Sequence, residues 1–166
     1  MLRFFLVASL LAGGTTAYAQ QAPANTARGA ANAPVDRPIS VGENAPDATL
    51  NELDRRIAPA VKQARATLPQ VKKRFLAGLP AGQALFLTTR ISDPNGLIEQ
   101  VFVRVAQWQG TKVQGTIANE LNVVKTYQPD QLITFSESAI LDWTVSQPDG
   151  TEEGNFVGKL LDAGPH

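Results

Sequence analysis

One stretch, residues 97–145, constrains the fold more than any other part of the chain. It alternates apolar and polar side chains, is rich in Val, Ile, Thr and aromatic residues, and is interrupted at Gln109-Gly110 and at Gln128-Pro129-Asp130. Alternation with a period of two is typical of β-strands with one buried face, and Gly, Pro and Asp mark the turns between such strands. The stretch therefore predicts an antiparallel meander.

The predicted strands cover residues 84–91, 97–108, 111–118, 131–136, 140–146 and 155–161. The second strand has apolar residues on both faces, which is typical of a central strand. One of its faces is formed by Val101, Val103 and Val105, and the other by Phe102, Arg104, Ala106 and Trp108.

Before the strands, apolar residues recur every three or four positions from residue 50 to residue 75, which predicts helix with one stripe packed on the sheet. Asp47 is a candidate N-cap. Pro59 and Pro69 lack the N–H that a helix interior uses, so we expect two or three short helices, each proline near a first turn. Phe75 ends the stripe and is predicted to be a buried anchor where helix meets sheet. The chain is thus expected to be an α+β protein, with short N-terminal helices packed on a curved antiparallel sheet of about five to six strands, a partly open barrel-like meander.

The N-terminal segment has the pattern of a secretory signal peptide. Residues 1–19 carry Arg3, an apolar run over residues 4–12 and the ending Ala17-Tyr18-Ala19, which predicts cleavage after Ala19 and Gln20 as the mature N-terminus. The apolar run is shorter than the roughly 20 residues that span a bilayer. We therefore expect a periplasmic or secreted protein with no stable membrane anchor after cleavage.

Residues 20–46 are rich in Ala, Pro, Asn and Gln and hold few large apolar side chains, which predicts a disordered leader. Residues 47–162 are expected to form a single α+β domain, and residues 163–166 a tail. The absence of Cys means that this domain must be stable without disulfides.

Composition excludes several kinds of chemistry. The formal net charge is +0, so no general field attracts nucleic acid. The one histidine is His166, which removes Ser-His and imidazole catalysis from the folded body, and thiolate metal sites need Cys. Neither a metal nor a cofactor is expected. Residues 52–74 are mainly basic, and residues from Asp93 onward are mainly acidic. Charge pairing between two packed layers is the favoured explanation, and an external partner of the basic patch is the alternative.

The candidate binding residues are Arg104, Trp108 and Asn119. Arg104 and Trp108 lie four residues apart on one predicted strand face, so they could flank a ligand, and Asn119 follows the neighbouring strand. In the alternative interpretation, Arg104 pairs with an acid across the sheet and the tryptophans, Trp108 and Trp143, close the core.

A second function class rests on carboxylates. A glycosidase needs two of them at a defined separation. The candidates are Glu99, Glu120, Glu137 and Asp142.

Several short motifs carry a family resemblance: Glu99-x-Val-Phe-Val-x-Val, Gln114-Gly115-x-Ile-x-Asn119, Asp130-Gln-Leu-Ile-x-Phe, Ile140-x-Asp142-Trp143, Gly154-Asn-Phe-x-Gly-Lys-Leu, Ala64-Arg65-x-Thr-Leu-Pro69 and Phe86-Leu-x-Thr. On these motifs, the chain resembles over residues 60–161 the YegJ-like bacterial family known as domain of unknown function 2314. The family's small-x-Asn-x-Pro step is present here as Asn119-Glu120-Leu121, without the proline. The resemblance implies a helix on a curved antiparallel sheet and relatives among secreted and immunity-like proteins. It implies no established activity and no catalytic residues.

The favoured function is a non-enzymatic binding or interaction module of the cell envelope, with an unknown protein or polymer as its partner. The alternative is a carboxylate-dependent hydrolase of a cell-wall or other polymer.

Overall fold

The fold is described by a computed structural model that covers residues 33–34, 39–41 and 47–163. The elements follow one another as β1 (Ser40–Val41), α1 (Asp47–Ala77), β2 (Ala84–Ser92), β3 (Ile98–Gln109), β4 (Lys112–Ile117), β5 (Leu132–Ser136), the 3-10 helix η1 (Glu137–Ala139), β6 (Asp142–Ser146), β7 (Glu152–Gly154) and α2 (Phe156–Asp162). The predicted signal peptide and its cleavage site after Ala19 lie outside the described residues.

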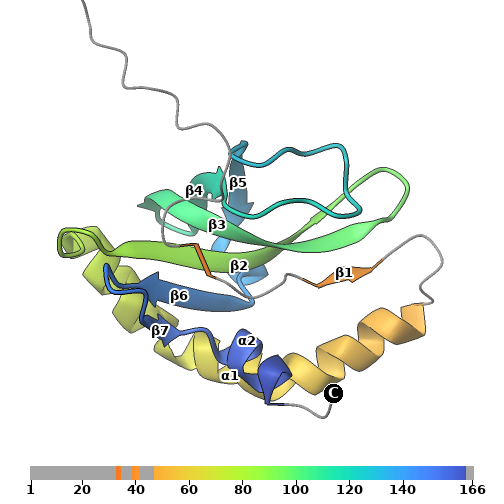
Figure 1. The fold of residues 1–166 in the computed structure, drawn as a ribbon, viewed down its shortest axis with the longest axis horizontal. Helices are drawn as coiled ribbons and strands as arrows, with labels where there is room; N and C mark the ends of the chain where they lie inside the picture. Colours follow the sequence, from red (N-terminus) through yellow and green to blue (C-terminus); the bar gives the residue numbers. More distant parts are fainter. Residues whose placement is uncertain (1–32, 35–38, 42–46, 164–166) are drawn as a thin grey trace, which may run out of the picture.

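The strands form one antiparallel sheet in the order β5-β4-β3-β2-β6-β7, with β1 paired to β3. The sheet curves over α1 and does not close into a barrel, as Figure 1 shows. The predicted α+β fold is therefore confirmed, and the first five predicted strands correspond to β2 through β6. The predicted meander holds from β2 to β5 and was wrong for β6, which pairs with β2 and not with β5.

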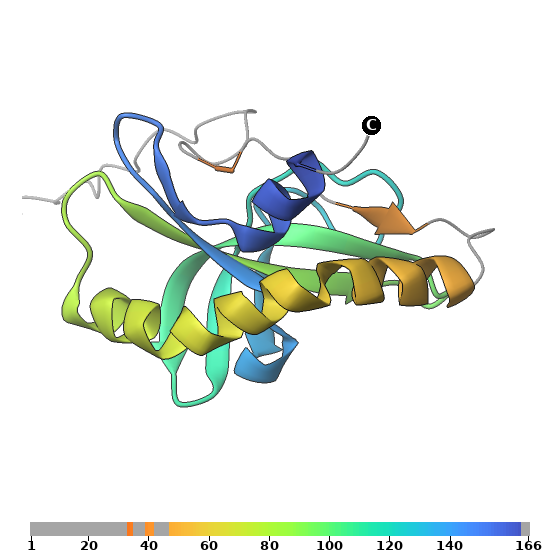
Figure 2. The same ribbon diagram turned by 90° about the horizontal axis from the view of Figure 1, so that it is seen from below.

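Helix α1 is one continuous helix of 31 residues, so the prediction of two or three short helices was wrong. Pro59 and Pro69 lie inside it and both are exposed. Because both rings point to solvent, the helix can bend away from the clash that each ring makes with the preceding turn. Figure 2 shows α1 curved along the sheet. Packing of the apolar stripe outweighs the two missing hydrogen bonds.

The main core lies between α1 and the sheet. Ala64, Leu68 and Val71 of α1 pack against Leu85 and Leu87 of β2 and against both tryptophans. Trp143 is buried, and its indole N–H donates to the Ala64 carbonyl oxygen at 3.2 Å and to Thr67 Oγ1 at 2.9 Å.

Phe75 packs at the end of this core, where its ring lies 6.5 Å from the Trp108 ring between centroids. The predicted contact between helix and sheet is confirmed there. Its predicted full burial was wrong, because the side chain is only half-buried.

A bulge in β3 changes which of its residues share a face. Val105 pairs with Gly115, and the next pair is Gln107 with Gln114, so Ala106 is an extra residue. One extra residue inverts the alternation of side chains beyond it. Trp108 therefore joins Val105 in the core on the α1 side, and the prediction that it shares a face with Arg104 was wrong.

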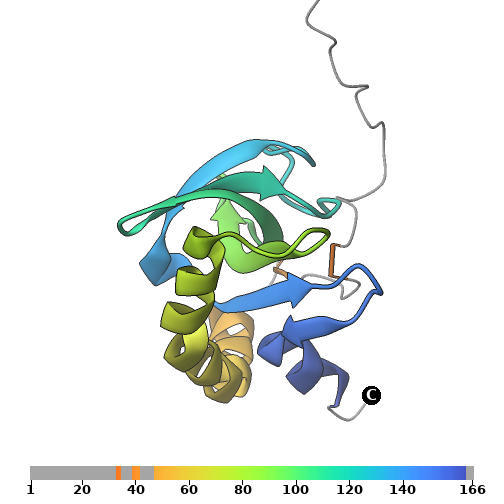
Figure 3. The same ribbon diagram turned by 90° about the vertical axis from the view of Figure 1, so that its left-hand side faces the viewer.

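The C-terminal prediction was also wrong, because residues 155–161 form most of α2 and not a strand. Phe156, Val157, Leu160 and Leu161 have the spacing of one helical face, and they pack on α1 in a cluster that contains Ile57 and Ala60. Figure 3 shows α2 beside α1, below the strands.

Parts of the expected leader contact the sheet. Ser40 and Val41 pair with Glu99 and Ile98 of β3, and Ala33 packs against a cluster that includes Phe86 and Phe102. The expectation of a leader without packing partners was therefore wrong for these residues, and most of residues 20–46 lies outside the described part of the chain. Of the described helices, none combines the length and the hydropathy needed to cross a membrane.

Candidate functional site

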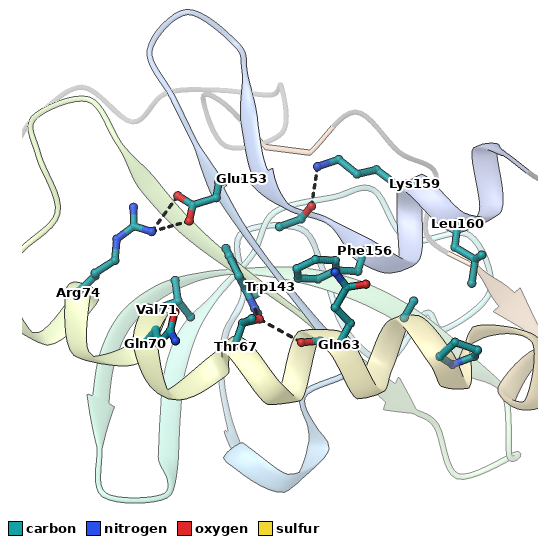
Figure 4. Close-up of a pocket in the computed structure, with 13 residues that line it drawn as sticks. Gln63, Thr67, Gln70, Val71, Arg74, Trp143, Glu153, Phe156, Lys159 and Leu160 are labelled. Carbon is teal, nitrogen blue, oxygen red and sulfur yellow. Dashed lines mark hydrogen bonds and ion pairs between the residues drawn. The ribbon is translucent and has the colours of Figure 1, made fainter.

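A groove of about 740 Å³ runs between α1 on one side and β7 and α2 on the other, and Figure 4 shows it in close-up. We call it the α1–α2 groove. Its lining consists of Pro59, Ala60, Gln63, Thr67, Gln70, Val71, Arg74, Trp143, Glu153, Gly154, Phe156, Lys159 and Leu160.

The floor of the groove is apolar and aromatic. Trp143 and Phe156 meet edge to face, with ring centroids 5.6 Å apart. Gly154 brings β7 against this pair at a φ of +85°, and a Cβ at this position would overlap the carbonyl oxygen and ring of Trp143. Glycine is required here both for its backbone conformation and for the close approach.

The α1 wall of the groove is a row of polar side chains. Gln63, Thr67, Gln70 and Arg74 follow one another at intervals of four, three and four residues, so they share one side of the helix. The hydroxyl group of Thr67 already accepts a hydrogen bond from the indole N–H of Trp143. Within the described part of the chain, the side-chain amides of Gln63 and Gln70 have no hydrogen-bond partner and remain free to donate and accept.

Charged groups mark the groove near β7 and α2. Arg74 Nη1 donates to both carboxylate oxygens of Glu153, at 2.7 and 2.8 Å. Lys159 Nζ donates to the carbonyl oxygen of Gly154 at 2.7 Å. Both cations thereby hold the β7 wall in place.

Asp142 lies behind the groove and fixes the position of α2. Its carboxylate accepts the Trp143 N–H at 2.8 Å and the Val157 N–H at 2.6 Å, so it ties the first turn of α2 to β6. Burial raises the pKa of Asp142 to about 6, against the lowering effect of these hydrogen bonds and of Lys159.

The three predicted binding residues are not brought together. Trp108 is buried, and its indole N–H donates to Glu137 Oε2 at 3.1 Å, while Lys72 Nζ lies 5.1 Å from the centre of its ring. Arg104 is exposed and precedes the bulge. The side chain of Asn119 accepts the Phe102 N–H at 2.8 Å and donates to the Glu120 carbonyl oxygen, so it joins the end of β4 to β3. A role of these residues in binding stays a prediction.

The candidate carboxylates are likewise dispersed, and none of the four lines the α1–α2 groove. Glu99 is fully buried and accepts the backbone N–H groups of Asn122, Val123 and Val124 at 2.7 to 3.0 Å. Glu137 pairs with Lys72 at 2.5 Å. Glu99, Glu137 and Asp142 therefore each have a structural role, and Glu120 is exposed.

The groove itself was not predicted from the sequence. One wall could have been found, because the polar residues Gln63, Thr67, Gln70 and Arg74 recur at helical spacing beside the apolar stripe. The opposite wall could not be found, because residues 155–161 were interpreted as a strand. No group of three or more acidic or His side chains suited to a metal ion occurs among the described residues.

The fold and the groove define a small α+β class of protein, in which an open antiparallel sheet curves over one long helix and a short C-terminal helix walls a groove. Residues 54–163 match the model of a bacterial family described as uncharacterized protein conserved in bacteria, domain of unknown function 2314. The chain belongs to this family, which confirms the resemblance seen in the sequence, although the match does not bear on the YegJ-like label. Neither a curated protein nor a solved structure gives a significant match.

Proposed function

We propose that this bacterial protein is a non-enzymatic binding module that holds an extended peptide segment of a partner protein in the α1–α2 groove. The observation that carries the proposal is the row of free amides, Gln63 and Gln70, along an apolar floor. Grooves of 300 to 1,000 Å³ with apolar walls and a few placed polar groups are the usual form of ligand sites.

The chemistry of the groove favours a peptide over a sugar. Carbohydrates stack on exposed aromatic faces, but Trp143 is only 4% exposed and its ring is packed against Thr67 and Phe156. A side-chain amide can donate to a peptide carbonyl and accept from a peptide N–H at the same time. Gln63 and Gln70 could therefore form hydrogen bonds with the main chain of a peptide ligand, while the apolar floor of the groove contacts one of its apolar side chains.

The proposal places the protein in the periplasm or outside the cell, in keeping with the signal-peptide pattern of residues 1–19. A peptide segment of another envelope protein is then the natural occupant. The hydrolase alternative loses its geometrical support, because Glu99, Glu137 and Asp142 are held by structural hydrogen bonds and none of them lines the groove.

Panning a randomised dodecapeptide library against the mature protein, residues 20–166, tests the proposal. Gln63→Trp places a large ring in the groove, and Ala66→Trp is the matched control, since Ala66 is exposed on the same helix and lines neither this groove nor the one described below. We expect enriched peptides to bind the wild type and Ala66→Trp alike, and to bind Gln63→Trp at least about tenfold more weakly, a loss of about 1.4 kcal/mol.

Two results would contradict the proposal. One is a library that yields no enriched peptide. The other is a set of peptides that bind Gln63→Trp as well as they bind the control, which would place their site elsewhere on the protein.

A further inference from the structure

A second groove, of about 460 Å³, lies along α1 and shares no lining residue with the α1–α2 groove. It is formed by α1, β2 and the residue before β6, and we call it the α1–β2 groove. Its apolar part comes from Ile57, Ala58 and Val61 of α1 and from Leu141.

The charged part of this groove is mainly positive. Lys62 and Arg65 from α1 and Arg90 from β2 line it, against one acid, Asp54. Three cations and one anion leave two positive charges uncompensated, in a chain whose formal net charge is +0. The excess is therefore local to the groove and does not reflect a basic protein.

Both arginines are held in place before any ligand arrives. Arg65 donates from Nε to the Ile140 carbonyl oxygen at 3.2 Å and from Nη2 to the Ser138 carbonyl oxygen at 3.1 Å. Arg90 donates from both of its terminal nitrogens to the carboxylate of Asp54. A guanidinium that is already ordered loses little side-chain entropy when it binds an oxyanion.

Two positive groups in the groove remain available. Carbonyl partners do not neutralise Arg65, and its Nη1 has no hydrogen-bond partner among the described residues. Lys62 is exposed and makes no ion pair with any residue in the described ranges. Both side chains come from α1 three residues apart, so they lie on neighbouring positions of its surface.

We propose that the α1–β2 groove binds a small organic carboxylate with an apolar chain, whose carboxylate lies between Lys62 and Arg65 and whose chain lies over Val61 and Leu141. Charge complementarity selects the anion, since three cations line this groove against one acid. The apolar strip beside the cations selects a ligand with a hydrocarbon part. This site is independent of the function proposed for the α1–α2 groove.

Octanoate is a suitable probe. Acetate is the control that has the carboxylate without the long chain, and 1-octanol is the control that has the chain without the carboxylate. Titration into the ¹⁵N-labelled mature protein, followed by amide chemical shifts, should give saturable binding of octanoate with the largest shifts at Val61, Lys62, Arg65 and Leu141. We expect acetate and 1-octanol each to bind at least about tenfold more weakly, because each lacks one half of the interaction.

A pair of charge reversals separates this site from general attraction to a basic helix. Lys62→Glu should weaken octanoate binding at least about tenfold, whereas Lys73→Glu, at an exposed position of α1 that lines neither groove, should change it less than about twofold. Gln63→Trp should leave octanoate binding unchanged, which keeps this test apart from that of the α1–α2 groove.

Equal losses in Lys62→Glu and Lys73→Glu would overturn the proposal, since they would show diffuse electrostatic attraction only. Equal affinity for 1-octanol would overturn it as well, because the cations would then play no part. Shifts centred on Gln63, Gln70 and Phe156 would place octanoate in the other groove and would have the same consequence.

Discussion

Glu99 and Asp142 are acidic side chains that strands carry into the interior, and each carboxylate accepts backbone N–H groups from a distant segment. Glu99 holds residues 122–124 of the loop between β4 and β5, and Asp142 holds the first turn of α2. Sequence alone could not separate these roles from catalysis, because an acid at a strand end has the same pattern whether it faces a pocket or a peptide N–H. The structure separates them by their partners.

The raised pKa of Asp142 predicts a specific pH dependence of stability. Its pKa is about 6 in the folded protein against an ordinary value of 3.8, so between these values the folded state holds a proton that the unfolded state has released. Stability from this group is therefore fully present below pH 3.8 and is lost as the pH rises through about 6. A shift of about two pH units corresponds to about 3 kcal/mol.

Asp142→Asn removes this titration, so unfolding by urea at pH 4 and at pH 7 measures it. The free energy of unfolding of the wild type, relative to that of the variant, should be larger at pH 4 by about 2 to 3 kcal/mol. Any constant loss from the missing acceptor cancels in this comparison. Parallel pH profiles for the two proteins would show that Asp142 titrates normally.

The half-buried position of Phe75 predicts a moderate effect of its removal. Phe75→Ala should lower the free energy of unfolding by about 2 kcal/mol, less than the 3 to 5 kcal/mol typical of a fully buried phenylalanine. Phe86, which is 0% exposed, is the reference: Phe86→Ala should show the larger loss in the same urea titration. If the two losses were equal, Phe75 would be as deeply buried as Phe86 in solution.

At the scale of elements, the sequence indicated those helices and strands whose apolar residues recur with a regular period. The strands over residues 84–146 were found because their apolar residues alternate or form short apolar runs between clear turns. The bulge at Ala106 has no such signal, and it alone moved Trp108 to the other face of β3. Two exposed prolines were compatible with several short helices or one curved helix, and only packing on the sheet decides between these outcomes.

Residues 33–41 should contribute to stability although they precede the predicted domain. A chain that begins at residue 42 loses the pairing of β1 with β3, the hydrogen bond from the Gln100 N–H to the Ile39 carbonyl oxygen at 2.8 Å, and the packing of Ala33. We expect its thermal midpoint to fall by about 4 to 8 °C, on the order of 1 to 2 kcal/mol.

The matched control for this deletion is a chain that begins at residue 33, which keeps these contacts. Its thermal midpoint should stay within about 2 °C of that of the chain beginning at residue 20, a change well under 1 kcal/mol. A midpoint that fell equally in both truncated chains would assign the stabilisation to residues 20–32.

At the scale of the whole molecule, the chain combines a family domain over residues 54–163 with an N-terminal region that the family match does not cover. Its class could be predicted because the α+β pattern is strong in the sequence. Its grooves could not, because each is lined by side chains that only tertiary packing brings together, such as Arg65 and Arg90 in one groove and Gln63 and Phe156 in the other.

The proposed export of the protein predicts a defined mature mass. Expressed with its first 19 residues in a Gram-negative host, the protein should be recovered from the periplasm or the medium with Gln20 as its first residue. Intact-mass spectrometry of that fraction decides the point. A major species that retains Met1 would contradict both the cleavage and the envelope location.

The burial of both tryptophans in the same cluster decides what optical measurements on this protein report. Trp143 touches α1 through Ala64 and Thr67, and Trp108 lies against Phe75 and Lys72 of the same helix. Tryptophan fluorescence therefore reports on the packing of α1 against the sheet. Detachment of β1 and Ala33 alone would leave that emission almost unchanged. If these contacts are lost before the rest of the fold, unfolding followed by fluorescence should therefore differ from unfolding followed by calorimetry.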